Sequence, residues 1–340
     1  MTGERKALPL ALTQGDPSGI GPEIAIKAWG KARDGSGVPF FVLGDPAHFK
    51  RVSHALRLDV PIAASSVDDV ERVFAEALPV VPLKAPVIGT PGRPSPVDAA
   101  ATIEAIERGV AMVAEGSASA LVTNPIAKDV LYAAGFRHPG HTEFLGELAL
   151  RYFGRAAQPV MMLWSPELAI VPATIHIPLA DVSSRLTRDF LVGTGRIVAK
   201  DMTSRFGVAE PRLVFCGLNP HAGERGSIGR EEIDLIAPAV EALQREGVRA
   251  IGPFPADTLF HAAGRSRYDA VIAMYHDQAL IPIKTIAFDS AVNVTLGLPF
   301  VRTSPDHGTA FDIAGQGKAN PASLMAALNL AARLARADGR

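Results

Sequence analysis

Short apolar runs alternate along the chain with longer segments in which apolar residues recur every three or four positions. The short runs are rich in Val, Ile and Leu, and they lack the strict alternation of a sheet that has one wet face. Runs of this kind are typical of strands buried on both faces, as in a parallel sheet covered by helices. Eight of them predict strands, at residues 8–13, 40–44, 120–124, 159–164, 168–176, 212–219, 270–276 and 291–297.

Three longer segments have the helical period, at residues 97–116, 230–247 and 321–339. The first ends at Gly116, a common helix stop, and the second contains an internal Pro238. Strands that alternate with helices predict an α/β fold with a largely parallel sheet and crossover helices. At 340 residues the chain exceeds one comfortable hydrophobic core, so we expect two lobes.

Two connections stand out by composition. Residues 32–39 form a polar surface connection, and residues 85–99 are the passage richest in Pro and Gly. The second is a candidate hinge or crossing between lobes.

Composition excludes several classes of protein. The chain is 48% hydrophobic and 20% charged, as in soluble globular enzymes, and its 34 basic and 35 acidic residues give a net charge of −1. This balance predicts neither a nucleic-acid nor a membrane partner. The single cysteine, Cys216, rules out an intrachain disulfide and indicates a reducing cytoplasm. The N-terminal apolar run is expected to be a strand rather than a signal peptide, and prolines interrupt the apolar stretch 159–180, so no membrane span is expected.

Three histidines lie at or just after the ends of predicted strands. His176 closes one strand, His221 follows the next, and His276 closes a third. Open α/β sheets bind their ligands at the carboxyl ends of the strands. Three neutral imidazoles are a well-established ligand set for a divalent metal such as Zn²⁺, although each histidine taken alone also fits an ordinary hydrogen-bonded role.

The turn "TQGDPSGIGPE" follows the first strand, where a nucleotide-binding loop is expected, but its glycines do not make GxGxxG, and no GxxxxGK[ST] occurs. It is either an anion-binding turn or a tight turn without a ligand. In "GHTEFL", His141 and Thr142 stand at a predicted helix start. Thr142 is either the N-cap or a donor to a substrate oxygen, with His141 as a phosphate or carboxylate partner.

Two basic residues follow His276 along the chain. Lys284 and Arg302 flank Asn293, all close to apolar runs. A lone Lys or Arg is usually a solvated charge, but this grouping favours an anionic ligand.

Taken together, these motifs resemble the 4-hydroxythreonine-4-phosphate dehydrogenase family of pyridoxal phosphate biosynthesis. The resemblance covers nearly the whole chain. It is carried, in order, by "GDPSGIGPEI", "VTNPIAK", "GHTEFL", "HIPL", "GLNPHAGE", "ADTLF", "AMYHDQALIPIK" and "VNVTLGLPFVRTSPDHGTAFDIAGQGKA".

The resemblance implies a fold of the isocitrate and isopropylmalate dehydrogenase type, with two α/β/α lobes, a central cleft and no classical Rossmann fingerprint. The predicted cofactor lobe comprises residues 1–130 and 295–340, and the substrate, metal and dimerisation lobe comprises residues 131–294. An obligate homodimer is implied, with the active site at the subunit interface. A cytoplasmic enzyme is expected.

The resemblance also assigns roles to single residues. It implies that His176, His221 and His276 bind one divalent metal ion (Zn, Mg or Co). The implied substrate contacts are His141, Thr142, Lys284, Asn293 and Arg302, and the implied contacts to the adenosine half of NAD or NADP are His307, Asp312 and Asn320. Lys284 is a candidate proton acceptor or charge partner, and Asp277 is a candidate orienting group for the His276 imidazole or a simple turn cap.

The implied reaction is oxidation of 4-phosphooxy-L-threonine by NAD(P). Its product, 2-amino-3-oxo-4-phosphooxybutyrate, then loses carbon dioxide to give 3-amino-2-oxopropyl phosphate. One departure from the family pattern bears on the substrate, because Arg225 stands where the family commonly has glycine, followed by Ser227 and Ile228. The alternatives are a dehydrogenase of 4-phospho-threonate, 4-phospho-erythronate or an aromatic cis-dihydrodiol, a metal-dependent hydrolase or lyase, and a non-catalytic binding protein.

Overall fold

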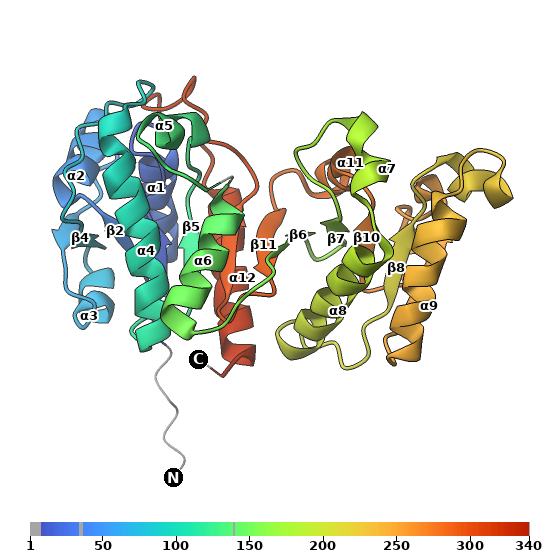
Figure 1. Cartoon of the computed structure of the whole chain (residues 1–340). Helices are drawn as coiled ribbons and strands as arrows, with labels where there is room; N and C mark the ends of the chain where they lie inside the picture. Colours follow the sequence, from blue (N-terminus) through green and yellow to red (C-terminus); the bar gives the residue numbers. More distant parts are fainter. Residues whose placement is uncertain (1–7, 34–36, 139, 340) are drawn as a thin grey trace, which may run out of the picture. The chain divides into compact units, whose positions relative to one another are not determined.

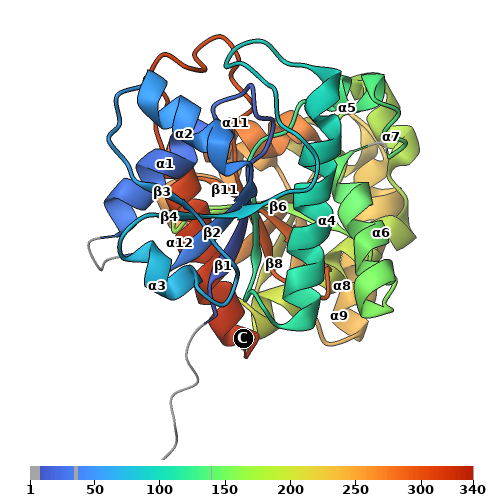
Figure 2. The same ribbon diagram turned by 90° about the vertical axis from the view of Figure 1, so that its left-hand side faces the viewer.

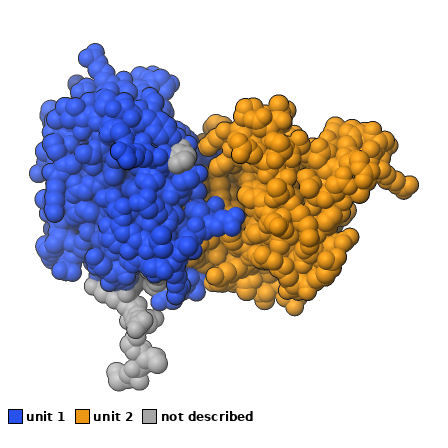
Figure 3. Space-filling model, in the orientation of Figure 1, with its two compact units in different colours: residues 1–159, 298–340 blue, residues 160–297 orange. Residues whose placement is uncertain are grey.

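The computed structural model describes residues 8–33, 37–138 and 140–339, and these residues form two compact units (Figure 3). Unit 1 comprises residues 1–159 and 298–340, and unit 2 comprises residues 160–297. The N-terminal residues 1–7 and part of the predicted connection 32–39 lie outside the described residues.

Unit 1 contains a parallel sheet in the order β3-β4-β2-β1-β5-β12. Leu10 in β1 lies opposite Phe40 in β2, and Ala11 lies opposite Leu121 in β5. The strands are β1 Leu10–Thr13, β2 Phe40–Gly44, β3 Ile62–Ala64, β4 Leu78–Pro82, β5 Leu121–Thr123 and β12 Arg302–Pro305.

Helices cover both faces of this sheet, with α4 and α6 on one side and α1 and α12 on the other (Figure 2). Their apolar faces explain the arrangement, because α4, α6 and strands β1, β2 and β5 all contribute fully buried side chains to one core cluster. The helices are α1 Gly21–Ala32, α2 Pro46–Ala55, α3 Val70–Phe74, η1 Pro96–Asp98, α4 Ala99–Glu115, α5 Lys128–Ala133, α6 His141–Phe153 and α12 Ala322–Ala337.

Unit 2 contains a mixed sheet in the order β11-β6-β7-β10-β8-β9. Strand β6 runs antiparallel to β7 and β11, whereas β7, β10, β8 and β9 are parallel. The carboxyl ends of these four strands therefore share one edge. The strands are β6 Val160–Trp164, β7 Ala169–Pro172, β8 Leu213–Cys216, β9 Ala250–Phe254, β10 Ala270–Ala273 and β11 Val292–Leu296.

Helices α8 and α9 pack together in unit 2, and α11 packs on β7 and β10 (Figure 1). The buried residues Ala279 and Ile283 of α11 join the core of the sheet. The helices are η2 Leu179–Asp181, α7 Val182–Arg185, α8 Arg188–Ser204, η3 Pro220–Gly226, η4 Glu232–Ile236, α9 Ala237–Arg245, η5 Ala256–Thr258, α10 Ala262–Arg265 and α11 His276–Ala287.

The α/β fold class and the presence of all eight predicted strands are confirmed. The predictions that His176 and His276 close their strands are wrong, because β7 ends at Pro172 and β10 at Ala273, and His276 is the first residue of α11. Gly116 ends α4 in the left-handed conformation, with φ of 77°. The predicted helix 230–247 differs, because its first part, η4, is a π-helix and α9 begins next to Pro238. A proline lacks the amide hydrogen that a regular helix needs there.

The division into units differs from the predicted lobes at residues 131–159. These residues belong to unit 1, because Phe144, Leu145 and Leu148 of α6 pack with Ile106 and Val110 of α4. The second border, at 297/298, lies three residues after the predicted one. Within the described part of the chain, no helix is both long enough and apolar enough to cross a membrane.

Two glycines of α1 give opposite predictions. A Cβ at Gly21 would lie 2.5 Å from the carbonyl oxygen of Gln14, whereas a Cβ at Gly30 meets nothing within 4 Å. Gly21→Ala should lower the free energy of unfolding by about 1–3 kcal/mol, because backbone cannot move aside cheaply. Gly30→Ala in the same helix should raise it by up to about 1 kcal/mol. Urea unfolding of both variants is the measurement. If the two substitutions change the free energy of unfolding equally, the close packing of Gly21 against Gln14 is contradicted.

Candidate active site

A buried arginine at the start of β12 is the main electrostatic feature of unit 1. Arg302 is 5% exposed, and its Nε and Nη2 donate to Oγ1 of Thr123 at 3.1 and 2.6 Å. Burial lowers the pKa of the guanidinium to about 10, so it stays charged at neutral pH. A fixed guanidinium at the carboxyl end of β5 and beside a helix start is a binding group for carboxylate or phosphate.

His141, the first residue of α6, lies beside this arginine. Its Nδ1 is 3.3 Å from Nη2 of Arg302, which can only donate, so Nε2 carries the imidazole hydrogen. Burial, and then the charges of Arg302 and Lys128, hold the pKa of His141 well below 6.5. The ring is therefore neutral. Its Nε2 is inaccessible to solvent and has no hydrogen-bond partner among the described residues, which leaves a donor for a ligand.

The start of α6 adds backbone donors to the same place. Its N-cap is Gly140, without a side-chain cap, so the N-cap role considered for Thr142 is wrong. Thr142 is instead the second helical residue. The first amides of a helix have no partner within the helix and favour anions. Arg302, His141 and the start of α6 together form what we call the anion cluster of unit 1.

The glycine-rich turn after β1 is a tight turn. The amide of Asp16 donates to Pro125, that of Ser18 to the Asp16 carboxylate, and that of Ile20 to Thr309. A Cβ at Gly15, where φ is 73°, would lie 2.6 Å from the carbonyl oxygen of Pro125. These amides are used inside the protein, so they do not support the anion-binding alternative for this turn.

Asp16 is a buried carboxyl group within that turn. It is 4% exposed, and burial raises its pKa to about 6, with smaller contributions from the carboxylates of Asp98 and Asp129. The hydrogen bond from the Ser18 amide, 2.9 Å from Oδ1, acts in the opposite direction. A carboxyl group whose pKa is near neutrality at a strand end is a candidate for proton transfer.

The predicted cofactor residues lie in the segment between β12 and α12. Asp312 and Asn320 are exposed, and His307 is half-buried. The Asn320 side chain accepts from the amide of Ala322 at 3.0 Å and borders a pocket of about 430 Å³, which His307 and Asp312 do not line. The structure therefore places the three residues in one segment without joining them in one pocket.

Lys27 of α1 holds that segment in place. Its Nζ donates to the carbonyl groups of Gly317 and Ala319, both at 2.8 Å, and to Glu23 at 2.7 Å. The Glu23 carboxylate also accepts from the amide of Ala319 at 2.9 Å. The backbone that leads to Asn320 is thus fixed from α1.

Two of the three predicted metal ligands lie together in unit 2. His176 follows β7, His276 begins α11 directly after β10, and their ring centroids are 5.7 Å apart. Nδ1 of His276 is 2.7 Å from Oδ1 of Asp277, which leaves Nε2 of His276 for another ligand. All three residues line a pocket of about 290 Å³. This donor set, two imidazoles with a carboxylate behind one of them, fits a divalent metal ion.

His221 lies on a separate turn after β8. Gln278 connects this strand end to that of β10, because its Oε1 accepts from the amide of Met274 at 2.7 Å and its Nε2 donates to the carbonyl of Gly217 at 2.8 Å. Among the described residues of this single chain, no group of three His, Cys, Asp or Glu side chains is placed to hold a metal ion. His221 therefore stays a predicted ligand.

Two of these histidines have backbones in the left-handed region, with φ of 53° at His176 and 52° at His221. Such a conformation costs about 1–2 kcal/mol per non-glycine residue. Strained residues of this kind cluster at functional sites.

Lys284 and Asn293 are the remaining predicted substrate residues, and both belong to unit 2. Lys284 lies two helical turns after His276 on α11, with its Nζ 5.3 Å from the ring centroid of Phe288. Asn293 lies on β11 opposite Leu163 of β6.

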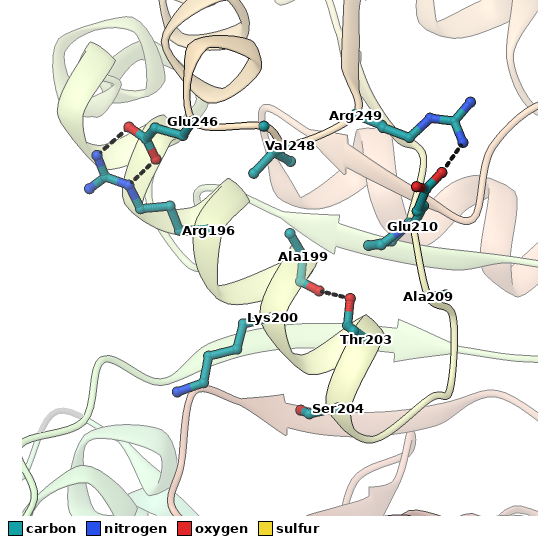
Figure 4. Close-up of a pocket in the computed structure, with 12 residues that line it drawn as sticks. Arg196, Ala199, Lys200, Thr203, Ser204, Ala209, Glu210, Glu246, Val248 and Arg249 are labelled. Atoms are coloured by element: carbon teal, nitrogen blue, oxygen red, sulfur yellow. Dashed lines mark hydrogen bonds and ion pairs between the residues drawn. The ribbon is translucent and has the colours of Figure 1, made fainter.

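A larger pocket of about 550 Å³ in unit 2 is a poor candidate site (Figure 4). It lies beside α8 and at the amino ends of β8 and β9, away from the strand ends that carry the histidines. Its Arg196 is paired with Glu246 and its Arg249 with Glu210, so its cations are largely neutralised.

The sequence reasoning missed Thr123, Gln278 and Asp16. Each lies at or just after the carboxyl end of a strand: β5, β10 and β1. All three stand in motifs that carry the family resemblance, "VTNPIAK", "AMYHDQALIPIK" and "GDPSGIGPEI". A polar residue directly after an apolar run was the available signal.

Comparison with known proteins agrees with the resemblance. The family model described as "Pyridoxal phosphate biosynthetic protein PdxA" matches residues 37–331. A protein of Xanthobacter autotrophicus called 4-hydroxythreonine-4-phosphate dehydrogenase is 58% identical over 98% of this chain and 95% of its own length. A protein of the same name from Bradyrhizobium diazoefficiens is 58% identical over 97% of this chain and 98% of its own length. The crystal structure of the Klebsiella pneumoniae enzyme of this name has a TM-score of 0.81 and 35% identity, covering 97% of this chain and all of that one.

Thr123 gives a prediction about stability. Thr123→Val keeps the shape but removes the acceptor of two Arg302 hydrogen bonds, so it should lower the free energy of unfolding by about 1–3 kcal/mol. Thr123→Ser keeps the hydroxyl group, so it should lower the free energy of unfolding by less than Thr123→Val. Urea unfolding of both variants at neutral pH is the measurement. A valine variant as stable as the serine variant would show that Thr123 does not hold Arg302.

Asp16 gives a prediction about pH. Its pKa is about 6 in the folded protein against an ordinary 3.8, so ionised Asp16 costs about 3 kcal/mol of stability above pH 6. Asp16→Asn should therefore raise the free energy of unfolding at pH 7 by about 2–3 kcal/mol. The gain should shrink as the pH falls from 6 towards 3.8, because the wild-type carboxyl group then takes up its proton. A difference between the two proteins that does not change with pH would contradict the burial of this charge.

Proposed function

The chain belongs to the family of the pyridoxal phosphate biosynthetic protein PdxA, and from this premise we propose that it oxidises 4-phosphooxy-L-threonine with NAD or NADP. The observation that carries the proposal is the anion cluster of unit 1. A buried guanidinium, an imidazole Nε2 donor and the first amides of α6 suit a substrate that carries a phosphate and a carboxylate.

The proposed reaction removes one hydrogen from C3 of the substrate and one from the hydroxyl group that C3 carries. A hydride passes from C3 to C4 of the nicotinamide ring, and the hydroxyl proton passes to a base. The product, 2-amino-3-oxo-4-phosphooxybutyrate, is a 3-oxo acid, which loses carbon dioxide to give 3-amino-2-oxopropyl phosphate. The chain must therefore bind the anionic ends, exclude water from C3 and accept one proton.

Residues of unit 1 would fix the substrate. Neutral His141 donates through Nε2 without adding a charge, while Arg302 supplies the positive charge and Thr123 fixes its direction. Thr142 lies at the next position of the helix start and is proposed as a further donor. A substrate held at these points keeps C3 at one position, which is the main requirement for hydride transfer.

Residues of unit 2 would hold a divalent metal ion, with His176, His221 and His276 as the proposed ligands. When bound, such an ion supplies Lewis-acid chemistry, lowering the pKa of an alcohol. Asp277 accepts from Nδ1 of His276 and so keeps the other ring nitrogen in the ligand form. Zn, Mg and Co are the proposed ions, of which Zn and Co suit imidazole ligands better.

The proton acceptor is proposed to be Lys284, which belongs to the same helix as His276. A lysine at this position serves either as the base or as a charge partner of the substrate. Asn293 is proposed to hydrogen-bond the substrate from β11.

The nicotinamide cofactor is proposed to bind at the segment that contains His307, Asp312 and Asn320. The fixing of that segment by Lys27 and Glu23 supports this assignment.

A homodimer with the active site at the subunit interface is part of the proposal. The exposed side chains of Leu179, Ile281 and Phe288 support it, with exposed fractions of 70%, 65% and 71%. Leu179 lines the same pocket as His176 and His276. Ile281 belongs to α11, the helix that His276 begins, and Phe288 directly follows the end of that helix. Apolar side chains beside a polar site favour cover by another chain. A cytoplasmic location stays a prediction.

Arg225 favours a second candidate substrate. It is exposed on the turn that carries His221, with Ser227 and Ile228 close behind it. An added cation there suits an acid in which a hydroxyl group replaces the amine, such as 4-phospho-threonate or 4-phospho-erythronate. A turnover screen of the three phosphorylated acids with both cofactors separates them, and a hydrolase or lyase would turn over without reducing nicotinamide.

Metal removal tests the proposal. Treatment with a chelator should stop NAD(P)H formation, and adding back Zn²⁺ or Co²⁺ should restore it. In His276→Ala, added metal should not restore activity, and kcat/KM should stay at least about a hundredfold lower, because a ligand is missing. His261→Asn is the matched control, since His261 caps α10 and asparagine can take over the cap. Unchanged turnover after chelation would contradict the proposal.

A further inference from the structure

The turn that carries His221 has an unusual backbone. Five consecutive residues, 221–225, all have left-handed φ angles: 52°, 52°, 75°, 43° and 56°. Only one of them, Gly223, adopts this conformation without steric cost. The four others bring Cβ close to the following carbonyl oxygen, so the turn needs support from its surroundings.

That support comes from a carboxylate buried under the turn. Glu232 is 3% exposed and begins the π-helix η4. Its Oε1 accepts from the backbone amide of Asn219 at 2.7 Å, and its Oε2 accepts from the side-chain amide of Asn219 at 3.1 Å. Asn219 is the residue from which the turn begins. A single carboxylate thus fixes both the backbone and the side chain at the entry to the turn.

Three glycines make room for this arrangement. A Cβ at Gly223 would collide with Oε2 of Glu232, and one at Gly217 would lie 3.2 Å from Oε1. A Cβ at Gly229 would collide with the side-chain amide of Asn219. The turn is therefore closed directly around the Glu232–Asn219 pair. A shift of either residue would move the backbone of the turn.

Glu231, the neighbouring acid, makes different contacts. Its carboxylate accepts from the Asn219 side chain at 2.8 Å and from the amide of Arg230 at 3.1 Å. It makes no hydrogen bond to the backbone of Asn219 and is half-buried. Glu231 is therefore a matched control for Glu232, with the same chemistry one residue away.

We infer that Glu232 is a positioning residue that holds the left-handed turn and thereby presents His221 to the metal ion. The inference rests on the proposed function for the role of His221. The arrangement explains why both oxygens of this buried acid accept from amide groups, and why four non-glycine residues keep a conformation that they otherwise avoid. Arg225 also has a left-handed backbone, with φ of 56°, at a position where the family commonly has glycine. Glycine would adopt this conformation without the steric cost that Arg225 has.

The test compares Glu232→Gln with Glu231→Gln in the full chain. In Glu232→Gln an amide group replaces one acceptor and faces an Asn219 donor, so the turn should open. We expect amide hydrogen exchange at residues 221–225 of the metal-free protein to become at least about tenfold faster. Co²⁺ alone should bind about 10–100-fold more weakly, as measured by calorimetry. Glu231→Gln should change both quantities by less than about threefold.

A rescue variant separates positioning from general loss of structure. Ala222 has φ of 52°, so Ala222→Gly lowers the cost of the turn without touching Glu232. It should recover at least half of the lost Co²⁺ affinity, on a logarithmic scale, in the Glu232→Gln background, and change the wild type little. If Glu232→Gln does not fold, Glu232→Asp, which shortens the reach by one carbon, takes its place.

The outcomes are distinct. Wild-type exchange rates and Co²⁺ affinity in Glu232→Gln would overturn the inference, as would a loss of affinity that Ala222→Gly does not recover. If His221→Ala binds Co²⁺ as tightly as the wild type, the proposed metal role of His221 fails. The exchange comparison of the two glutamate variants still decides whether Glu232 holds the turn.

Discussion

The cost of keeping the Arg302 guanidinium out of water governs the site in unit 1. A buried charge is tolerated only where hydrogen bonds surround it, and two of those bonds end on the Thr123 hydroxyl. The charge in turn helps to keep His141 neutral, so that this ring donates through Nε2 without a charge of its own. One buried cation thus links β12 to β5 through Thr123 and adds to the burial that keeps the ring at the start of α6 neutral.

Unit 2 follows a different constraint. Its parallel strands bring polar residues to one edge of the sheet, and the chain must turn sharply there to present them. His176 and His221 both have left-handed backbones, and Gln278 connects the ends of β8 and β10. Backbone strain is offset by buried polar contacts such as those of Glu232 with Asn219.

The sequence predicts much of the fold because the strands that matter are apolar. β2 and β10 are continuous runs of buried residues, and the period of α4 leads directly to its glycine stop. β12 was missed because its sequence, "RTSP", is polar and begins with a charge. β4 and β9 contain prolines, which argue against a strand unless the neighbouring strands supply the context.

The candidate site is predictable in part. His176 and His276 follow apolar runs, and position in the sheet is enough to bring them together. The burial of Arg302 and the left-handed turn at His221 depend on contacts with residues far along the chain, such as Thr123, or on a buried neighbour, Glu232. Local sequence carries no sign of either.

The ratio of products tests the central claim most directly. With 4-phosphooxy-L-threonine as substrate, carbon dioxide and NAD(P)H should be measured in the same reaction with the metal-loaded protein. The account predicts one molecule of NAD(P)H for each molecule of carbon dioxide released. Carbon dioxide or phosphate released without reduced nicotinamide would contradict it, because the chain would then be a lyase or hydrolase that uses the same histidines.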